Sequence, residues 1–518
     1  MRPHLSSGDP IFEILHRDGL GRIGKLTTAH GKITTPTLMP VIDPSDVILT
    51  PIEMRREFGT ELVMTNAYLI MKYFGEKATK YGIHRILGYD GPIMTDSGGY
   101  QILRYGGVEV SPEEIIRYQD IMSPDIATIL DTPTGVHPTK ERAKQTVQTT
   151  VERAKQAVQL RSNPKVMWCG PVQGGLFNDL VAKSAREIGK LDYHIHAIGG
   201  PVELLEKYRY VELVDLVITA KQNLPLQRPV HLFGAGHPMM LALSVAMGCD
   251  LFDSAAYILY ARDGRYLTSE GTFHLADLSY FPCECPVCVE NFPQKLRHMP
   301  KEKQIKLLAI HNLHVTFGEI RRVRQLIIEG KLWEHVQLRC RAHPRLLEGF
   351  RRLLEYTNFI ERFDPVTKKS TFYYSGGESV GRPEVLRHRR RLENRYKPPS
   401  LPTLAIMPAF ERERPKLSKP ERTHLVRVIP PFGVIPEELE EIYPLGQTRA
   451  PKKLDPEQIK TATESLRRFL KLYGKCYKQI LLFNNEHHWS NSLIKACNSV
   501  VEKLKIIELY KIHHRKIK

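Results

Sequence analysis

The chain has 518 residues, of which 42% are hydrophobic and 25% charged, so we expect a globular protein of two to four domains. No apolar run approaches the roughly 20 residues that a membrane-spanning helix needs, and the N-terminal MRPHLSSGDP lacks the apolar core of a signal peptide. These features exclude a membrane protein and predict a cytoplasmic one.

The net charge of +18 is concentrated in one part of the chain. Residues 341–518 hold 36 Lys and Arg against 20 Asp and Glu, whereas residues 1–340 hold 39 against 37. A basic appendage on a neutral body favours a nucleic acid that the appendage holds and the body processes. The alternative is a solvated surface rich in Lys and Arg.

Residues 35–340 alternate between short apolar runs and charged amphipathic stretches. The apolar runs are ELVMTNAYLI, GPIMTDS, DIATILDTPTG, KVMWCGPVQGG, HIHAIGGP, RPVHLFGAGHP and DLFDSAAY. Helix-like stretches such as PEEIIRYQDIM and FNDLVAKSAREIGKL lie between them. This alternation is typical of βα units around a parallel sheet, and the number of units favours a (β/α)8 TIM barrel over an open, doubly wound sheet. No GxGxxG motif follows the first run, which disfavours a dinucleotide-binding fold.

The alternation ends near residue 345. We predict a catalytic domain over residues 1–345, a basic helical accessory domain over 346–430 and an α+β accessory domain over 431–518. In the last domain QILLFNN is a candidate buried strand and SLIKACNSVVEKLK a candidate helix.

Several polar residues and glycines stand where an apolar run ends, and in a parallel barrel these ends share one face. They are Asp96, Asp131, Gln173, Gly199, Gly200, Gly234, Gly236 and Asp253. Any one of these acids taken alone could be a helix cap or a turn residue. Together they predict a common site.

Two carboxylates that flank an anomeric carbon are the usual equipment for glycosidic chemistry, one as the nucleophile and the other as the general acid and base. A carboxylate and an amide suit the polar edge of a purine. Glycines let the backbone approach a flat ring, on which an aromatic side chain such as Tyr100 or Phe233 can stack. The residues therefore predict a purine pocket with glycosyl-transfer carboxylates.

A cysteine cluster follows the barrel, in FPCECPVC. Cys283, Cys285 and Cys288 form a C-x-C-x2-C array, and either His311 or His314 could complete a tetrahedral zinc site. Four protein ligands leave no position open for a reacting water, so the predicted zinc ion is structural. The alternative is a chance cluster of free thiols.

In combination, these motifs resemble the tRNA-guanine transglycosylases. The resemblance is carried by TDSGGYQ at 95–101, SPDIATILD at 123–131, GPVQGG at 170–175, AIGG at 197–200, FDSAAY at 252–257 and CxCxxC…HN at 283–312. The segment DSAAYILYARDGRY and the basic C-terminal region are similar to the archaeal branch. The resemblance implies a zinc-bearing TIM barrel that exchanges guanine at position 15 of tRNA for 7-cyano-7-deazaguanine, in archaeosine synthesis.

The resemblance also implies a role for each matching residue. Asp253 is the nucleophile and Asp96 the general acid and base. Asp131 and Gln173 bind the base edge, Gly200 supplies a backbone contact, and Tyr100 and Phe233 sandwich the ring. The zinc ligands are Cys283, Cys285, Cys288 and His311, because His311 occupies the family's HN position. The implied partners are tRNA, a 7-deazaguanine base and a second copy of the chain.

The chain departs from the family in two places. AIGG continues as Pro201–Val202 rather than the bacterial Leu-Ala, so no preference for an aminomethyl base is inferred. We find no segment similar to the PUA RNA-binding domain of archaeal enzymes, and a separate PUA-type protein is one hypothesis. The alternative functions are a queuine-type enzyme acting at anticodon position 34, an archaeosine synthase and a non-catalytic tRNA-binding paralogue.

Overall fold

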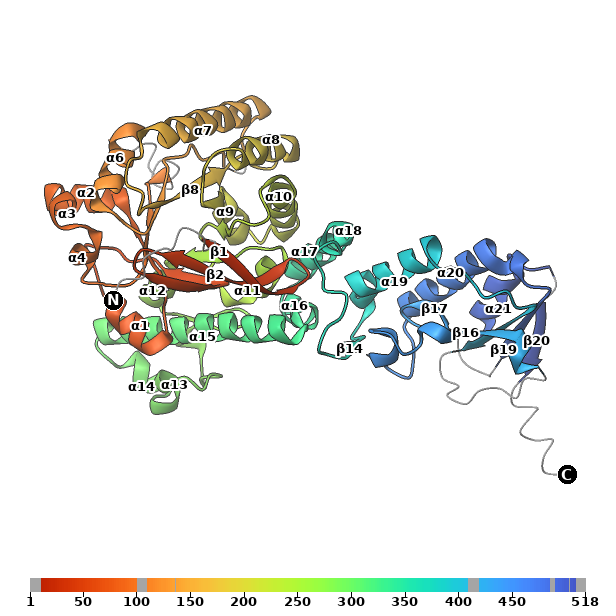
Figure 1. Cartoon of the computed structure of the whole chain (residues 1–518). Helices are drawn as coiled ribbons and strands as arrows, with labels where there is room; N and C mark the ends of the chain where they lie inside the picture. The colour runs from red at the N-terminus through yellow and green to blue at the C-terminus, as the bar shows by residue number, and fades with distance from the viewer. Residues whose placement is uncertain are drawn as a thin grey trace. The chain divides into compact units, whose positions relative to one another are not determined.

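The computed structural model describes residues 11–99, 110–135, 137–408, 419–484, 490–502 and 504–508. The chain divides into two compact units, Met1–Leu353 and Leu354–Lys518 (Figure 1). The domain boundaries inferred from the sequence, at 345/346 and 430/431, stay predictions.

The first unit is built on eight parallel strands that follow one another in chain order. They are β4 (Thr37–Pro40), β5 (Val63–Asn66), β6 (Ile93–Asp96), β7 (Ile126–Thr128), β8 (Met167–Val172), β9 (Ile195–Ile198), β10 (Val230–Leu232) and β11 (Leu251–Ser254). β11 pairs with β4, and a parallel bridge between Val41 and Met64 joins the β4 and β5 ends of the sheet. The (β/α)8 barrel predicted from the sequence is therefore confirmed.

Helices connect the strands and lie on the outside of the barrel (Figure 1). They are α1 (Pro51–Phe58), α2 (Ala67–Phe74), α3 (Glu76–Tyr81), α4 (Ile83–Leu87), α6 (Pro112–Met122), α7 (Lys140–Leu160), α8 (Asn178–Gly189), α9 (Pro201–Glu206), α10 (Tyr210–Asn223), α11 (Pro238–Ala246) and α12 (Ala256–Arg262). The apolar run ELVMTNAYLI contains both a strand and a helix. Asn66 ends β5, and its side chain accepts a hydrogen bond from the Leu69 backbone at 3.0 Å, which caps α2.

A three-stranded antiparallel sheet covers one end of the barrel. It consists of β1 (Phe12–Asp18), β2 (Gly21–Thr28) and β3 (Gly31–Thr35). Leu26 and Ile33, both fully buried, pack with the inward-facing residues of the barrel strands, among them Met94 and Leu251. This sheet therefore closes the apolar interior of the barrel at the end where the strands begin.

A buried ion pair fastens this sheet to the barrel. Nε and Nη2 of Arg22 donate to the two carboxylate oxygens of Asp250, each at 2.7 Å, and the two side chains are 2% and 0% exposed. Asp250 directly precedes β11 and also accepts from the Val230 backbone of β10 at 2.8 Å. Although burial alone would raise the pKa of Asp250, Arg22 holds it below its ordinary value.

Beyond the barrel, the first unit continues through a hairpin and a group of helices. The elements are β12 (Arg265–Leu267), β13 (Thr272–His274), α13 (Pro286–Glu290), α14 (Pro293–Arg297), α15 (Lys301–Glu329), α16 (Leu332–Cys340) and α17 (Pro344–Leu354). The long helix α15 packs against α11, α12 and α13. It thereby joins the cysteine-bearing segment to the barrel wall.

The second unit contains a five-stranded sheet of order β17-β16-β15-β19-β20. Its strands are β15 (Thr403–Pro408), β16 (Thr423–Ile429), β17 (Gly433–Pro436), β19 (Gln479–Asn484) and β20 (Leu504–Glu508). The helices are α18 (Thr357–Ile360), α19 (Pro383–Asn394), α20 (Pro456–Tyr473) and α21 (Ser490–Asn498), and β14 (Phe372–Tyr373) pairs with β18 (Thr448–Arg449). The expected strand QILLFNN corresponds to β19, but the expected helix SLIKACNSVVEKLK ends at Asn498, and its last two residues belong to β20.

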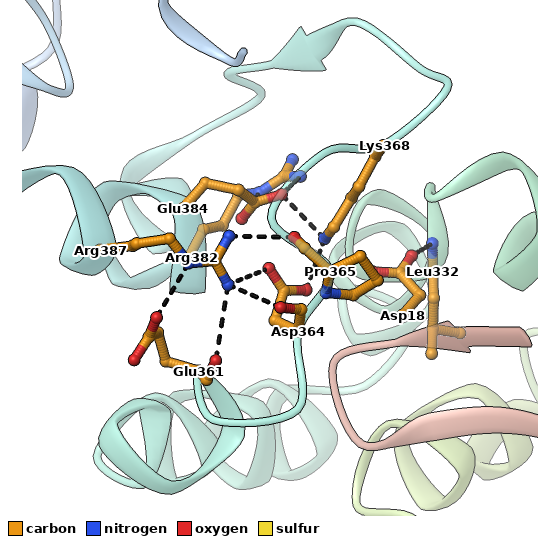
Figure 2. A network of polar contacts seen from close by, with 9 residues as sticks. All are labelled: Asp18, Leu332, Glu361, Asp364, Pro365, Lys368, Arg382, Glu384 and Arg387. Atoms are coloured by element: carbon orange, nitrogen blue, oxygen red, sulfur yellow. Dashed lines mark hydrogen bonds and ion pairs between the residues drawn. The ribbon is translucent and has the colours of Figure 1, made fainter. Parts of the chain in front are cut away.

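Six charged side chains form a buried network in this unit (Figure 2). Lys368 contacts Asp364 at 2.7 Å and Glu384 at 2.8 Å. Arg382 also pairs with Glu384, at 2.8 Å, and Arg387 pairs with both Glu361 and Asp364. Each of the three carboxylates therefore faces at least one cation, and Arg390 makes a further contact with Glu361 at 3.5 Å.

Among the residues that the structure describes, no helix is both long and apolar enough to cross a lipid bilayer.

We predict that Asp250→Ala lowers the free energy of unfolding of the barrel unit by about 3–5 kcal/mol, because the variant leaves Arg22 buried without its counter-charge. Urea unfolding at pH 7 measures this loss. The pair stabilises the folded protein at pH values above the ordinary carboxyl pKa of about 3.9. This stabilisation is lost at lower pH, where Asp250 becomes protonated.

The matched control is Asp90→Ala, which breaks the ion pair between Asp90 and Arg55. The Asp90 side chain is 86% exposed. This change should cost about 1 kcal/mol or less. Similar losses in the two variants would contradict a structural role for the buried pair.

Candidate active site and metal centre

The polar residues at the strand ends continue the inward-facing positions of their strands. Met94, Met167, Ile195 and Leu251 pack inside the barrel. Side chains two residues apart on a strand share a face. Asp96, Gly199 and Asp253 extend these inward series along their strands. The site therefore lies at the end of the barrel opposite the antiparallel sheet.

Asp96, the last residue of β6, is only partly exposed. Its Oδ2 accepts from the Asn66 side-chain amide at 3.0 Å and from the Gly98 backbone at 3.2 Å. Burial raises the pKa of Asp96, and the neighbouring Asp131 and Asp253 carboxylates raise it further, to about 7. Asp96 can therefore hold or release a proton at neutral pH.

Asp131 and Gln173 lie side by side, and both are buried. The Gln173 carbonyl accepts from the Thr134 backbone at 3.0 Å, which turns the amide nitrogen toward Asp131, at 2.5 Å from its Oδ2. Burial raises the pKa of Asp131 to about 6, although the hydrogen bond from Gln173 opposes the rise. The pair presents a fixed acceptor beside a fixed donor.

Two glycines make room for the side chains of Asp131 and Gln173. A Cβ at Gly99 would lie 2.3 Å from Oδ1 of Asp131, and one at Gly199 would lie 2.2 Å from Nε2 of Gln173. Gly200 has another requirement, because its φ of +79° places it in the left-handed region, while no atom stands within 4 Å of its Cβ position. The backbone at Gly200 therefore borders open space.

Asp253 is held through one of its two oxygens. Its Oδ1 accepts from Nε2–H of His231 and from the Gly234 backbone, both at 2.8 Å. Its Oδ2 accepts no hydrogen bond from the described residues, and the side chain is 13% exposed. This arrangement fixes the carboxylate and leaves one oxygen available for reaction.

Of the two aromatic residues expected to sandwich a flat ligand, Phe233 lies among the described residues. Phe233 packs against the barrel interior and lies edge-on to His231, with ring centroids 4.7 Å apart. Tyr100 lies outside the described residues.

Two positioning residues, Asn66 and His231, were not predicted from the sequence. Each lies two residues from an inward-facing apolar residue, Met64 and Phe233 respectively. Both are polar residues at inward-facing positions near the end of a strand, and this pattern in the sequence could have indicated them. His231 is fully buried, and its Nδ1 has no partner among the described residues. His231 therefore serves Asp253 alone.

Cys283, Cys285, Cys288 and His311 bring their ligand atoms within 4.8 Å of one another. The Nδ1 atom of His311 lies 3.4 Å from the sulfur atoms of both Cys285 and Cys288. Three thiols and one imidazole are a donor set that could hold a metal ion.

The orientation of His311 fits this role. Its Nε2–H donates to the Leu267 carbonyl at 2.9 Å, so Nδ1 faces the thiols without a proton. The adjacent Asn312 accepts from the Leu267 backbone at 2.9 Å and so holds the same strand, β12. His314 points elsewhere, because its Nε2 bonds Glu57 at 3.1 Å. Of the two histidines left open by spacing, the structure brings only His311 to the cysteines.

The two sites have different chemical capacities. The barrel site combines a carboxyl that exchanges a proton near neutrality, a carboxylate with a free oxygen, and an acceptor–donor pair for a flat heterocycle. At the metal centre, four candidate ligands from the protein would fill a tetrahedral coordination shell and leave no position for a reacting water. The metal centre is therefore suited to a structural role.

Comparison with known proteins relates the chain to one family. The family model described as "TGT: Queuine tRNA-ribosyltransferase" matches residues 18–345. Archaeal proteins named tRNA-guanine(15) transglycosylase are similar over most of the chain. The Methanococcus aeolicus protein is 45% identical over 87% of this chain and 70% of its own length. The Methanosarcina mazei protein is 46% identical over 87% and 90%, respectively, and the Methanobrevibacter smithii protein is 43% identical over 97% and 75%. The chain belongs to the tRNA-guanine transglycosylase family.

Proposed function

We propose that this protein exchanges the guanine at position 15 of tRNA for 7-cyano-7-deazaguanine, an early step of archaeosine synthesis, through a covalent ribosyl–Asp253 intermediate. The observation that carries the proposal is that two carboxyl groups of different character occupy one site. Asp253 is anchored through Oδ1 alone, and Asp96 has a pKa raised to about 7. The names of the archaeal relatives support the reaction and the position.

In the first displacement, Oδ2 of Asp253 attacks C1′ of the ribose on the face opposite the guanine. The C1′–O bond forms as the C1′–N9 bond breaks, and the electron pair of the broken bond stays with the base. Asp96 enters protonated and gives its proton to the departing guanine, which leaves neutral.

In the second displacement, the Asp96 carboxylate takes the N9 proton of the incoming 7-cyano-7-deazaguanine. N9 attacks C1′, and the ester bond to Asp253 breaks. Two inversions retain the configuration at C1′, and one glycosidic bond replaces another, so no nucleotide triphosphate is needed. Retaining carboxyl pairs stand about 5–5.5 Å apart, and we expect this spacing between Asp96 and Asp253.

The same proposal assigns base recognition to Asp131 and Gln173. The Asp131 carboxylate accepts from the ring N–H and the exocyclic amino group, and the Gln173 amide donates to O6. The Gly200 backbone contacts the base edge, while Phe233 and Tyr100 cover its faces. The Thr134 hydrogen bond to Gln173 supports this assignment because it fixes which end of the amide faces the pocket.

We further propose that Cys283, Cys285, Cys288 and His311 hold one structural Zn²⁺. Thiolate and imidazole donors suit this ion, and His311 already presents an unprotonated Nδ1 to the sulfur atoms. The ion would hold the segment around Cys283–Cys288 against α15 and β12 and take no part in the displacements.

We also propose three partners for the protein. The basic second unit would contact tRNA, a second copy of the chain would complete a homodimer, and a separate PUA-type protein would assist RNA binding. Tight binding of tRNA by this chain alone would count against the last of these.

The function is tested by incubating the protein with labelled 7-cyano-7-deazaguanine and a tRNA transcript that has guanosine at position 15. We expect label at that position and none in a transcript with adenosine there. Asp253→Asn should reduce incorporation by on the order of 10⁴-fold, because the nucleophile is lost. Asp263→Asn, at a 61% exposed carboxylate of the same unit, is the control.

Other outcomes would redirect the assignment. Label at position 34 would support the queuine-type alternative that the name of the family model suggests. Retained tRNA binding without incorporation would indicate a non-catalytic paralogue.

The raised pKa of Asp96 predicts the pH dependence of the first displacement. Only the protonated acid can serve the leaving guanine, and its fraction falls as the pH rises through about 7. The single-turnover rate of covalent complex formation should therefore fall by about tenfold per pH unit well above pH 7. Rapid quenching and a denaturing gel that resolves the protein–tRNA adduct measure this rate.

Asp96→Asn is the control for this profile. It should slow adduct formation by about 10²–10⁴-fold and abolish the break near pH 7. If the variant kept the same break, the titration would belong to another group.

The metal centre predicts one zinc ion per chain by elemental analysis. Cys288→Ser should lose the ion and lower the thermal midpoint of the first unit by about 5–10 °C, because binding energy at a structural site adds to folding energy. His314→Ala should retain the ion, since this histidine bonds Glu57 instead. Loss of zinc from His314→Ala with retention in His311→Ala would overturn the ligand assignment.

A further inference from the structure

The second unit contains a pocket of about 380 Å³ that plays no part in the proposed displacements. Its volume lies in the range of pockets that hold small ligands or single groups of larger ones. Its lining comes from Val366, from α19, from the basic segment directly after that helix, and from the loop over residues 439–445. All of these elements belong to the same unit.

The charges at the floor of the pocket are already neutralised. Glu384 is its one lining carboxylate, and it pairs with both Lys368 and Arg382 at 2.8 Å (Figure 2). Arg387 pairs with Glu361 and Asp364. Burial lowers the pKa of His388 to about 4, so this side chain is neutral at pH 7. The floor therefore neither attracts nor repels an anion strongly.

One wall carries three cations without such compensation. Arg391, Arg395 and Lys397 line the pocket and are exposed. Among the described residues, no carboxylate lies within ion-pair distance of any of them. Arg391 lies in the last turn of α19, Arg395 is the residue that caps the C-terminus of that helix, and Lys397 follows two residues later. Three cations exceed what the roughly half charge at a helix C-terminus requires.

A second part of the lining, the apolar wall, consists mainly of apolar side chains. Leu439, Ile442 and Pro444 contribute to it, and Ile442 is 47% exposed. Tyr443 lies beside them, and its buried hydroxyl has no hydrogen-bond partner among the described residues. Burying an unpaired hydroxyl is costly, and a ribose or base oxygen against this wall would accept the hydrogen bond that it can donate.

We propose that this pocket binds one nucleotide of an RNA chain, with the phosphodiester on the Arg391–Arg395–Lys397 wall and the sugar and base against the apolar wall. The inference deepens the proposed function and rests on tRNA as the substrate. Arginine forks match phosphate oxygens in geometry as well as in charge, and aromatic and apolar surfaces accept any base. The pocket would thus hold the tRNA body without reading its sequence.

The test compares tRNA binding by the full chain with that of the variant Arg391→Ala/Arg395→Ala. Fluorescence anisotropy measures the affinity over a range of salt concentrations. We expect the dissociation constant to rise about tenfold or more, and the salt dependence to decrease by about 0.7–0.9 for each phosphate that the variant no longer neutralises. Both side chains are exposed, so an unchanged thermal midpoint should show that the variant is folded.

The matched control is Arg467→Ala/Lys471→Ala. These two exposed cations also stand four residues apart, on α20, and do not line the pocket. This control removes the same charge, so a general electrostatic effect would weaken tRNA binding equally in both variants. An equal loss of affinity in both, or unchanged affinity in the pocket variant, would overturn the proposal.

A second arm distinguishes an RNA chain from a free nucleotide. AMP at millimolar concentration serves as the probe for wild type and the pocket variant. If AMP binds only the wild type while both proteins bind tRNA equally, the pocket is a free-nucleotide site and the RNA assignment fails. Binding is measured without base exchange, so absent label incorporation would contradict the proposed function and leave this result intact.

Discussion

The organising constraint of this protein is the crowding of three carboxyl groups at one end of a closed parallel barrel. Asp96, Asp131 and Asp253 stand at or just beyond the ends of their strands, and burial together with the charges of the other two carboxylates raises the pKa of Asp96 to about 7. The molecule tolerates this repulsion because each carboxyl has its own donors. Asn66 serves Asp96, and His231 serves Asp253.

Away from the proposed active site, buried charges are neutralised by ion pairs. Asp250 is as buried as any group in the site, yet Arg22 neutralises it through two hydrogen bonds. In the six-residue network of the second unit, each carboxylate likewise has at least one cationic partner. By contrast, the carboxyls at the barrel mouth and the cations of the Arg391–Arg395–Lys397 wall have no counter-charge of this kind among the described residues. The first suits proton and glycosyl transfer, and the second suits a polyanion.

Much of the barrel could be predicted because its signals are local. Seven apolar runs correspond to strands β5–β11, since a strand buried on both faces is a continuous apolar run. The eighth strand, Thr37–Pro40, was not predicted, because its four residues end at a proline and give little periodicity. The antiparallel sheet over one end and the five-stranded sheet of the second unit depend on pairings between distant segments, which no local pattern reveals.

The sequence by itself determined the fold class, the family and the chemical types at the site, because strand-end acids and closely spaced cysteines are properties of neighbouring residues. Only the tertiary structure decided how those groups behave. It selected His311 over His314 by turning one toward the thiols and the other toward Glu57. It also added His231, which supports Asp253 from a neighbouring strand. Burial and mutual repulsion, and hence the shifted pKa of Asp96, exist only when strands far apart in the chain are brought together.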